Sequence, residues 1–257
     1  SIKRLETINE LRQAINRNQL TLHFQPKIKL PDGEVCAVEA LLRWEHPTKG
    51  MVPPNDFIPL AEQTGYIHSL TMWVLESAIQ HCAKWNESGT SIPIAVNLSA
   101  RNIQDENLPS RLQELLDQHS VNPHLITLEI TETAIVMDPK RAMEVLNRLN
   151  KMCLQLSIDD FGTGYTSLSY LNDLPVDEIK IDRSFVMDML NNKGNATIVH
   201  SIIELAHNMS HRVVAEGVEN QEILDRLCEL GCDVAQGYHI SRPVSAGQLN
   251  NWLAERT

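Results

Sequence analysis

An alternation of strand-like and helix-like segments runs through the 257 residues and constrains the fold more than any other feature of the chain. Short runs rich in apolar and β-branched residues have the length of strands, and the stretches between them are amphipathic. The expected strands are 20–28, 35–44, 92–97, 126–130, 154–159, 178–181, 212–215 and 234–238. The expected helices are 5–16, 57–63, 70–85, 108–119, 139–151, 195–209, 220–230 and 247–254.

The first two strands depart from this rhythm. Only residues 29–34 separate them, and Asp32-Gly33 is a hairpin signal, so the two strands should run antiparallel. From Val35 onward, strand and helix alternate, which implies right-handed parallel crossovers. The pattern predicts a TIM-like (β/α)8 barrel whose first strand is antiparallel to the rest. The alternative is an open doubly wound sheet, but no Gly-x-Gly-x-x-Gly follows an early strand.

The bulk composition is that of a well-cored globular domain, with 42% hydrophobic and 21% charged residues. The net charge of −11 argues against a broad nucleic-acid-binding surface, and no apolar run has the length of a membrane span. Five scattered cysteines without zinc spacing are expected to be buried side chains of a reduced intracellular protein. We expect one domain over 1–257, excised from a longer multidomain chain, because the sequence lacks an initial Met.

Two adjacent carboxylates, Asp159 and Asp160, close a strand-like run and are followed at once by the glycine-containing segment 161–165. Like charges this close repel each other, so one or both would take up a proton unless a cation lies between them. A divalent metal ion is the usual cation in such a place. The pair makes metal-assisted hydrolysis the leading functional interpretation.

Further polar residues stand at or near the ends of other expected strands, where the chemistry of a barrel is located. Oxygen ligands without His or Cys suit Mg²⁺ or Mn²⁺, with Ca²⁺ as an inhibitor, and two ions could lie about 3.5–4 Å apart. Any one residue alone could be a helix cap or a solvated strand end, and for Asn97 alone that alternative is the better one. The set consists of Glu39, Asn97, Glu129, Lys180 and Glu216.

Lys180 lies between two isoleucines in its strand and is therefore expected to be half-buried and to face inward. A buried Lys needs anionic partners or loses its proton. In either state it could hold an attacking water or stabilise negative charge on a phosphate. The alternative is a structural ion pair with Asp182 or Glu178.

The glycines of segment 161–168 indicate a mobile loop that shapes metal occupancy, because no Gly-Lys-Ser/Thr of a nucleotide-binding loop follows. Glu132 could anchor this loop or cap the segment that follows it. Arg43 lies on the same side of its strand as Glu39, and its guanidinium could bind a phosphate through two hydrogen bonds. The alternative is a surface ion pair with Glu45. His207 and His211 have no evident third ligand and are interpreted as structural.

Eight motifs stand in order along nearly the whole chain. They are Gln25-Pro26, Glu39-Ala40-Leu41-Leu42-Arg43-Trp44, Asn97-Leu98-Ser99, Glu129-Ile130-Thr131-Glu132, Asp159-Asp160-Phe161-Gly162-Thr163-Gly164, Lys180-Ile181-Asp182, Ala215-Glu216-Gly217-Val218-Glu219 and Gln236-Gly237-Tyr238. Any one of them is weak, but the ordered set is specific. It resembles the EAL-domain family of cyclic di-GMP phosphodiesterases, whose name-giving triplet is Glu39-Ala40-Leu41 in this chain.

The resemblance implies a barrel with a reversed first strand and two Mg²⁺ or Mn²⁺ ions in each active site. Lys180 would touch the nucleophilic water, as proton acceptor or as electrostatic partner, and Glu216 would support Lys180 and the second metal. The implied metal ligands are Glu39, Asn97, Glu129 and Asp159, with Asp160 for the second ion. The implied catalytic residues are Lys180, Glu39, Glu216 and Glu132. Residues implied to line the dinucleotide or the metal-water site are Gln25, Leu42, Arg43, Lys180, Glu216, Gly217, Val218, Glu219, Gln236 and Tyr238.

The implied reaction is hydrolysis of one 3′–5′ phosphodiester of cyclic di-GMP to linear pGpG in the bacterial cytoplasm. The first alternative is a receptor that binds cyclic di-GMP without turnover, and a weaker one is a metal hydrolase of another small phosphoester. We expect no nucleic-acid binding and no membrane contact by this segment, and an upstream regulatory or DNA-binding module outside it. A homodimer is expected through segment 162–171 and the helix that follows it, because a flexible loop beside the metals runs into apolar residues.

Overall fold

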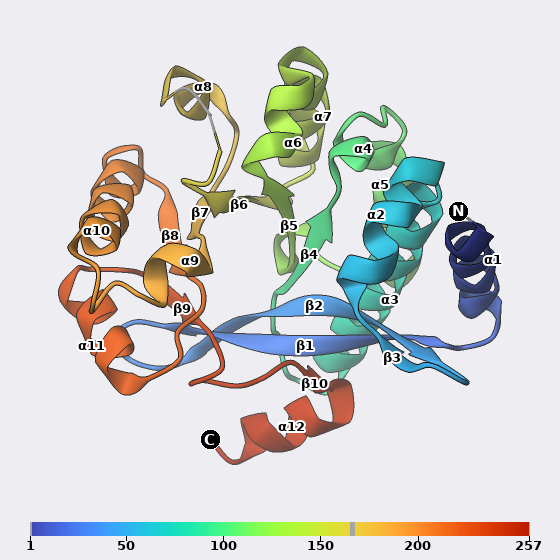
Figure 1. The fold of residues 1–257 in the computed structure, drawn as a ribbon, viewed down its shortest axis with the longest axis horizontal. Coiled ribbons are helices and arrows are strands. Elements are labelled where there is room, and N and C mark those ends of the chain that lie inside the picture. The colour runs from blue at the N-terminus through green and yellow to red at the C-terminus, as the bar shows by residue number, and fades with distance from the viewer. Residues whose placement is uncertain (1, 165–167, 257) are drawn as a thin grey trace.

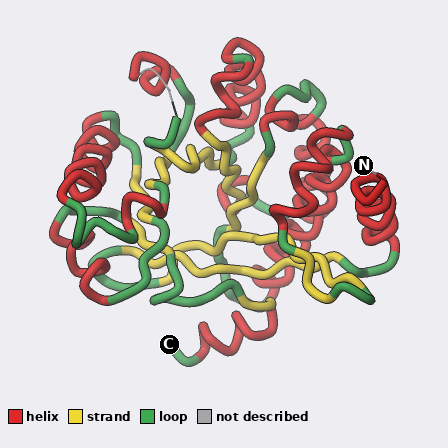
Figure 2. Tube along the Cα trace, in the orientation of Figure 1, coloured by secondary structure: helices red, strands yellow, loops and turns green. Residues whose placement is uncertain are grey.

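The computed structural model describes residues 2–164 and 168–256, and it has a ring of strands surrounded by helices (Figures 1 and 2). The strands are β1 Leu20–Lys29, β2 Val35–His46, β3 Gly50–Val52, β4 Ile94–Leu98, β5 Ile126–Thr131, β6 Gln155–Phe161, β7 Glu178–Ile181, β8 Arg212–Ala215, β9 Val234–Gln236 and β10 Val244–Ser245. The helices are α1 Ile2–Asn16, α2 Pro54–Thr64, α3 Ile67–Glu87, α4 Ala100–Ile103, α5 Leu108–His119, α6 Glu132–Met137, α7 Pro139–Lys151, α8 Leu168–Asp173, α9 Arg183–Val186, α10 Lys193–Asn208, α11 Gln221–Glu229 and α12 Ala246–Ala254, with a 3₁₀ turn η1 at Pro123–Leu125.

The sheet closes into a barrel of eight strands, as predicted. The order β1-β9-β8-β7-β6-β5-β4-β2 is completed by pairing of β1 with β2, and β10 and β3 extend it outside the ring. Pairs from β2 through β9 are parallel, whereas β1 is antiparallel to both β2 and β9. The predicted reversal of the first strand is confirmed, because the short connection between β1 and β2 leaves no room for a crossover helix.

Each of the eight predicted helices is present, with ends shifted by a few residues. In α7, the buried Ala142, Val145, Leu146 and Leu149 repeat at helical spacing, and the Asp138 side chain accepts a hydrogen bond from Arg141 N at the helix start. The sequence prediction missed β3, β10, α4, α6, α8 and α9, because elements of two to six residues are too short to show a period. The strand predicted for 234–238 ends at Gln236.

Two apolar clusters hold the helices against the barrel. The larger surrounds the strands on their helix-facing side, and the smaller packs Leu11 of α1, Trp44 of β2 and Phe57 of α2 together. The polar buried residues differ in place: Lys27, Glu39, Glu129, Asp159 and Lys180 belong to strands of the ring. Most buried charges are therefore on strands of the ring, and the buried Glu132 at the start of α6 is an exception.

The described cysteines are all free, and Cys82 and Cys232 are buried as predicted. The prediction of burial was wrong for Cys36 and Cys228, which are partly buried, and for Cys153, which is exposed in the turn after α7 at φ 64°. Among the described residues, none of the helices combines the length and the apolar character needed to cross a membrane.

Candidate active site at the barrel mouth

Lys180 of β7 is fully buried and lies among carboxylates from four other parts of the barrel. Its Nζ is 2.7 Å from Glu129 Oε2, 2.7 Å from Glu216 Oε1, 3.1 Å from Asp159 Oδ1 and 3.8 Å from Glu39 Oε2. Burial by itself would lower the pKa of Lys180, but the surrounding carboxylates raise it well above its usual value. The residues that the sequence pattern placed at strand ends therefore converge on one cation.

One detail of the Lys180 prediction was wrong, and its alternative partners do not pair with it. The side chain is fully rather than half-buried, because Lys180 points into the closed ring, where carboxylates surround it. The alternative partners are engaged elsewhere: Glu178 lies near Lys27 and Arg212, and Asp182 accepts a hydrogen bond from Ser184 N at the start of α9.

Glu39 of β2 is held by two amide side chains. Asn97 Nδ2 donates to Glu39 Oε1 at 2.7 Å, and Gln236 Nε2 donates to Glu39 Oε2 at 2.6 Å. Gln236 Nε2 also lies 3.0 Å from Gln25 Oε1. Burial, followed by the charge of Glu129, raises the pKa of Glu39. Residues from β1, β2, β4 and β9 thus fix one carboxylate at the mouth.

Asp159 and Asp160 both reach the mouth although they are neighbours in a strand. Asp160 has φ 54°, and the pairing of β6 with β7 shifts register between Ile158 and Phe161. This irregularity interrupts the alternation that would send successive side chains to opposite faces. Oxygen atoms of Asp159, Asp160 and Glu216 lie within 4.8 Å of one another.

This crowding shifts the acidity of two carboxyl groups. Burial and the charge of Asp159 raise the pKa of Asp160 to about 6. Burial raises the pKa of Glu216 to about 8, although Lys180 acts in the opposite direction. Lys180 alone does not balance the negative charge of these buried carboxylates, and a bound cation would supply the missing positive charge.

Glu129 of β5 has a fully buried side chain, like Lys180. Lys180 Nζ contacts its Oε2, and Lys27 Nζ of β1 lies 2.5 Å from its Oε1. Burial would raise the pKa of Glu129, but the two lysines hold it at about 2. Lys27 was missed in the sequence, although its position two residues after Gln25 in the same strand indicates that it faces inward.

Glu132, the first residue of α6, contacts the glycine-containing segment after β6. Its Oε2 accepts hydrogen bonds from Gly162 N at 3.2 Å and from Gly164 N at 3.3 Å. A Cβ at Gly164 would lie 2.9 Å from the Glu132 carboxyl carbon, so the two groups are closely packed. These contacts favour the anchoring role over the capping role.

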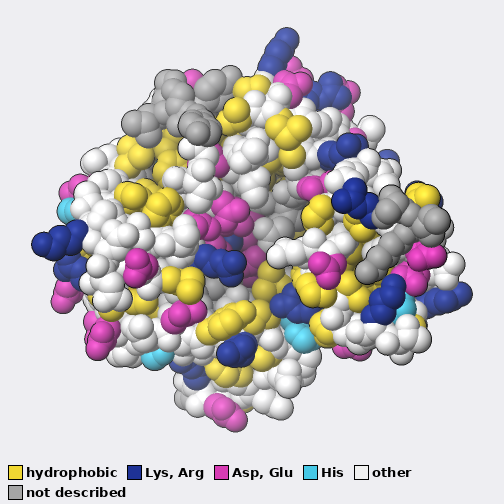
Figure 3. Space-filling model, viewed as in Figure 1, with side chains coloured by type: hydrophobic (Ala, Val, Ile, Leu, Met, Phe, Trp, Pro, Cys, Tyr) yellow, Lys and Arg dark blue, Asp and Glu magenta, His cyan; other side chains and the backbone are white. Residues whose placement is uncertain are grey.

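A cleft of about 1080 Å³ opens above the carboxylates. Figure 3 shows Asp and Glu side chains gathered in the hollow at the centre of this face, with Lys and Arg beside them. Predicted residues that line the cleft are Gln25, Glu39, Arg43, Asp159, Asp160, Glu216, Gly217, Glu219, Gln236 and Tyr238. Arg183 and Asn55 also line it and were missed, because they lie at the starts of α9 and α2 rather than at strand ends.

Three predicted lining residues do not line this cleft, and one of them is the fully buried Lys180. Leu42 lines an adjoining cleft of about 510 Å³, together with Asn97, and packs against both apolar clusters, while its neighbour Leu41 faces the larger cleft. Val218 is fully buried in the apolar core. Arg43 Nη1 donates to the Leu42 carbonyl at 2.9 Å and lines both clefts.

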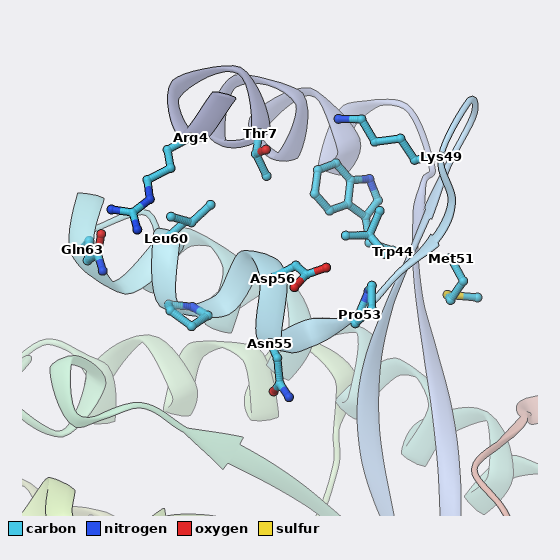
Figure 4. A pocket seen from close by; sticks show the side chains of 12 residues that line it. Arg4, Thr7, Trp44, Lys49, Met51, Pro53, Asn55, Asp56, Leu60 and Gln63 are labelled. Atoms are coloured by element: carbon cyan, nitrogen blue, oxygen red, sulfur yellow. The ribbon is translucent and has the colours of Figure 1, made fainter. Parts of the chain in front are cut away.

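A further cavity of about 660 Å³ lies between α1, α2 and the β2–β3 hairpin (Figure 4). Its lining includes Arg4, Trp44 and Gln63, and Lys49 at its edge is paired with Glu10. The carboxylates around Lys180 do not line it. The chemistry of the chain is therefore concentrated at the barrel mouth.

The EAL domain family model matches residues 8–243. The chain belongs to the EAL domain family. A bifunctional diguanylate cyclase/cyclic di-GMP phosphodiesterase, MucR of Pseudomonas aeruginosa, is 42% identical over 248 residues, which are 96% of this chain and 36% of MucR. The cyclic di-GMP phosphodiesterase NbdA of the same organism is 41% identical over 250 residues, 97% of this chain and 32% of NbdA. The EAL chain thus spans about a third of the length of these curated relatives.

Solved EAL structures share the fold. A structure described as the PaMucR phosphodiesterase in complex with c-di-GMP superposes with a TM-score of 0.92 at 42% identity, covering 95% of this chain and 99% of that one. The FimX EAL domain from Pseudomonas aeruginosa bound to c-di-GMP gives 0.86 at 30% identity, covering 93% and 97%. The predicted family and fold are confirmed.

The donor set of this EAL domain suits a hard divalent cation. EAL phosphodiesterases depend on a metal ion, and here carboxylate oxygens crowd together without sulfur or imidazole donors in the described cluster. Gln236 Oε1 is buried and has no hydrogen-bond partner among the described residues, so an acceptor is left for a water or an ion. The close cluster is Asp159, Asp160 and Glu216, and the predicted ligands Glu39 and Glu129 adjoin it through Lys180.

Proposed function

We propose that this EAL domain hydrolyses one 3′–5′ phosphodiester of cyclic di-GMP to give linear pGpG. The observation that carries the proposal is the fully buried Lys180, which has four carboxylates within 4 Å of its Nζ. Three of these carboxylates, those of Glu39, Asp159 and Glu216, line the cleft. A site of this kind suits an anionic substrate only when cations balance its acids. The named activities of the relatives MucR and NbdA support cyclic di-GMP as that substrate.

We propose Mg²⁺ or Mn²⁺ as the cation, in up to two positions. Asp159, Asp160 and Glu216 would surround one position, and Glu39, Asn97, Glu129 and Asp159 are proposed to hold the other. When bound, such ions lower the pKa of a water and neutralise a phosphate. Ca²⁺ is expected to occupy the site and inhibit, because it accepts a larger and looser ligand shell than Mg²⁺.

The side chains of the EAL domain would then orient the reacting groups. Lys180 would donate a hydrogen bond to the attacking water and stabilise charge that develops on the phosphate, while Glu216 and Asp159 keep its Nζ at the mouth. Glu132 would hold the 162–164 segment beside the metals.

The proposed contacts of the dinucleotide follow the walls of the cleft. Arg43 offers a guanidinium for a phosphate, and Tyr238, 55% exposed and covered on one face by Arg242, offers a ring for a base. Gln25, Gly217, Glu219 and Gln236 are proposed to complete the wall. Leu42 and Val218 would contribute by packing behind it.

The test is chromatographic detection of pGpG from cyclic di-GMP and Mg²⁺. We expect turnover by the natural sequence and a loss of 100-fold or more in Lys180→Met, because one charge-stabilising group typically contributes about 10²–10³ in kcat. Lys49→Met, which removes an exposed lysine paired with Glu10, is the matched control and should retain full activity. Tight binding of cyclic di-GMP with no pGpG from metal-loaded protein would instead support the receptor alternative.

We also propose four features of the setting of this domain. The domain would be one EAL unit over 1–257 of a longer chain, in the bacterial cytoplasm, with a regulatory or DNA-binding module upstream. A homodimer is proposed through segment 162–171, of which residues 165–167 lie outside the described part of the chain. Light scattering that shows a fully active monomer at high concentration would contradict the dimer.

A further inference from the structure

A column of alternating charges runs through the barrel beneath Lys180. From the lower end, Arg212 Nη2 lies 3.6 Å from Glu178 Oε2, and Glu178 Oε1 lies 3.9 Å from Lys27 Nζ. Lys27 Nζ is 2.5 Å from Glu129 Oε1, and Glu129 Oε2 is 2.7 Å from Lys180 Nζ. The residues come from β8, β7, β1 and β5, so the column crosses the ring rather than following one strand.

Lys27 is the member of this column that has no role in the hydrolysis proposed above. It is 2% exposed and does not line either cleft at the mouth. Its closest charged partner is Glu129, whose fully buried side chain is shared between the two lysines, one at each oxygen. The orientation of a carboxylate with no access to water is set by such partners.

We propose that Lys27 is a positioning residue for the hydrolysis proposed above, on which this inference rests. Lys27 neutralises part of the charge of Glu129 from the side opposite the mouth. Lys180 Nζ can therefore remain close to Asp159 and Glu216 at the mouth. Without Lys27, Lys180 alone would neutralise the charge of Glu129. The stronger attraction to Glu129 would then move Lys180 Nζ deeper into the barrel, away from the reacting groups. Lys27 thus acts through Glu129 and touches no substrate.

A purely structural role for Lys27, as counter-ion to Glu178, fits the geometry less well. Glu178 is 3.9 Å from Lys27, against 2.5 Å for Glu129. Glu178 also has Arg212 and accepts a hydrogen bond from Ser157 Oγ at 3.1 Å, so it keeps partners without Lys27. Without Lys27, Glu129 would keep only its ion pair with Lys180.

The two roles predict opposite signs for metal affinity. If Lys180 moves down, its Nζ competes less for the oxygens of Asp159 and Glu216, so a cation should bind there more tightly while turnover falls. If Lys27 only supports the fold, its loss should loosen the barrel and weaken both metal binding and turnover.

The experiment compares Lys27→Met, which keeps the length of the side chain, with the surface control Lys49→Met. For Lys27→Met we expect kcat to fall 10- to 100-fold, the usual effect of removing a group that orients a ligand residue, with KM for cyclic di-GMP within twofold. Calorimetric titration of the metal-free proteins with Mn²⁺ should show several-fold tighter binding by Lys27→Met and no change in Lys49→Met.

Weaker Mn²⁺ binding by Lys27→Met, or a kcat within threefold of the natural sequence, would overturn the positioning role. If the single variant does not fold, Lys27→Met/Glu178→Gln removes both charges of that pair and is measured in the same way. Absence of pGpG from the natural sequence would reject the proposed function, whereas the Mn²⁺ comparison would still decide the role of Lys27.

Discussion

Lys180 is a cation whose place in the fold depends on its neighbours. An unpaired buried ammonium would lose its proton, but four carboxylates lie within 4 Å of this one. Acidic groups outnumber basic groups in this cluster, because the four carboxylates and Asp160 face only two buried lysines, Lys180 and Lys27. Burial and, to a smaller extent, this excess of negative charge raise the pKa values of Glu216 and Asp160.

The raised pKa of Glu216 predicts a pH-dependent stability of the metal-free protein. A carboxyl group whose pKa rises from 4.5 to about 8 on folding holds its proton in the folded state while the unfolded chain has lost it. The free energy of unfolding therefore falls as pH rises through this window. In EDTA, thermal melting of Glu216→Gln should depend less on pH between 5 and 8 than melting of the natural sequence. If the melting temperatures of the two proteins depended on pH in the same way, Glu216 would not be the group that causes this pH dependence.

At the scale of elements, irregular segments at the strand ends place the reactive groups. The register shift in β6 brings both aspartates to the mouth, and α6 begins directly after β5, so Glu132 lies opposite the glycines that follow β6. Backbone amides at the mouth are thereby tied to a carboxylate of the neighbouring element. The conformation of residues 162–164 is thus coupled to that of the Asp159–Asp160 pair.

Glu132→Ala should lower kcat about 10- to 100-fold, because the amides of Gly162 and Gly164 lose their acceptor and the adjoining aspartates lose their alignment. The control is Glu204→Ala, which removes an exposed carboxylate of α10 that pairs with His200. Steady-state kinetics at saturating Mg²⁺ measures the effect. Equal activity of the two variants would show that the anchor has no part in turnover.

At the scale of the whole molecule, the site is assembled from the full circumference of the barrel. Gln25 and Lys27 come from β1, Glu39 from β2, Glu129 from β5 and Lys180 from β7. Closure through the β1–β2 and β1–β9 pairs brings the first strand against the last. A ligand at the mouth therefore contacts strands from both ends of the sequence and should stabilise the fold as one unit.

Cyclic di-GMP with Ca²⁺, which is expected to block turnover, should raise the melting temperature. Saturation at 100 times Kd adds about 2.7 kcal/mol to the free energy of unfolding. For a domain of this size that corresponds to a shift of about 5–11 °C. Asp159→Asn should show a much smaller shift under the same conditions, measured by differential scanning fluorimetry. An equal shift in the variant would place the ligand elsewhere.

The barrel, its reversed strand and the strand-end acids follow from local patterns. Apolar periodicity and the Asp32-Gly33 turn depend on neighbours in the chain, and so they can be read from residues alone. Some short elements could not be predicted from the sequence, because their stability comes from contacts with distant residues. They are α4, α6, α9, β3 and β10. The ordered motifs of the EAL family identified most of the site, including Glu39, Asp159 and Lys180.

Only the tertiary structure decided which charges pair. The chain leaves Lys180 free to pair with Asp182 or Glu178, yet closure of the ring aims it at Glu129 and Glu216. Lys27, 102 residues from Glu129, becomes its nearest cation for the same reason. Such pairs depend on the inward direction of each side chain and on the exclusion of water, and both arise only once the strands have closed into a barrel.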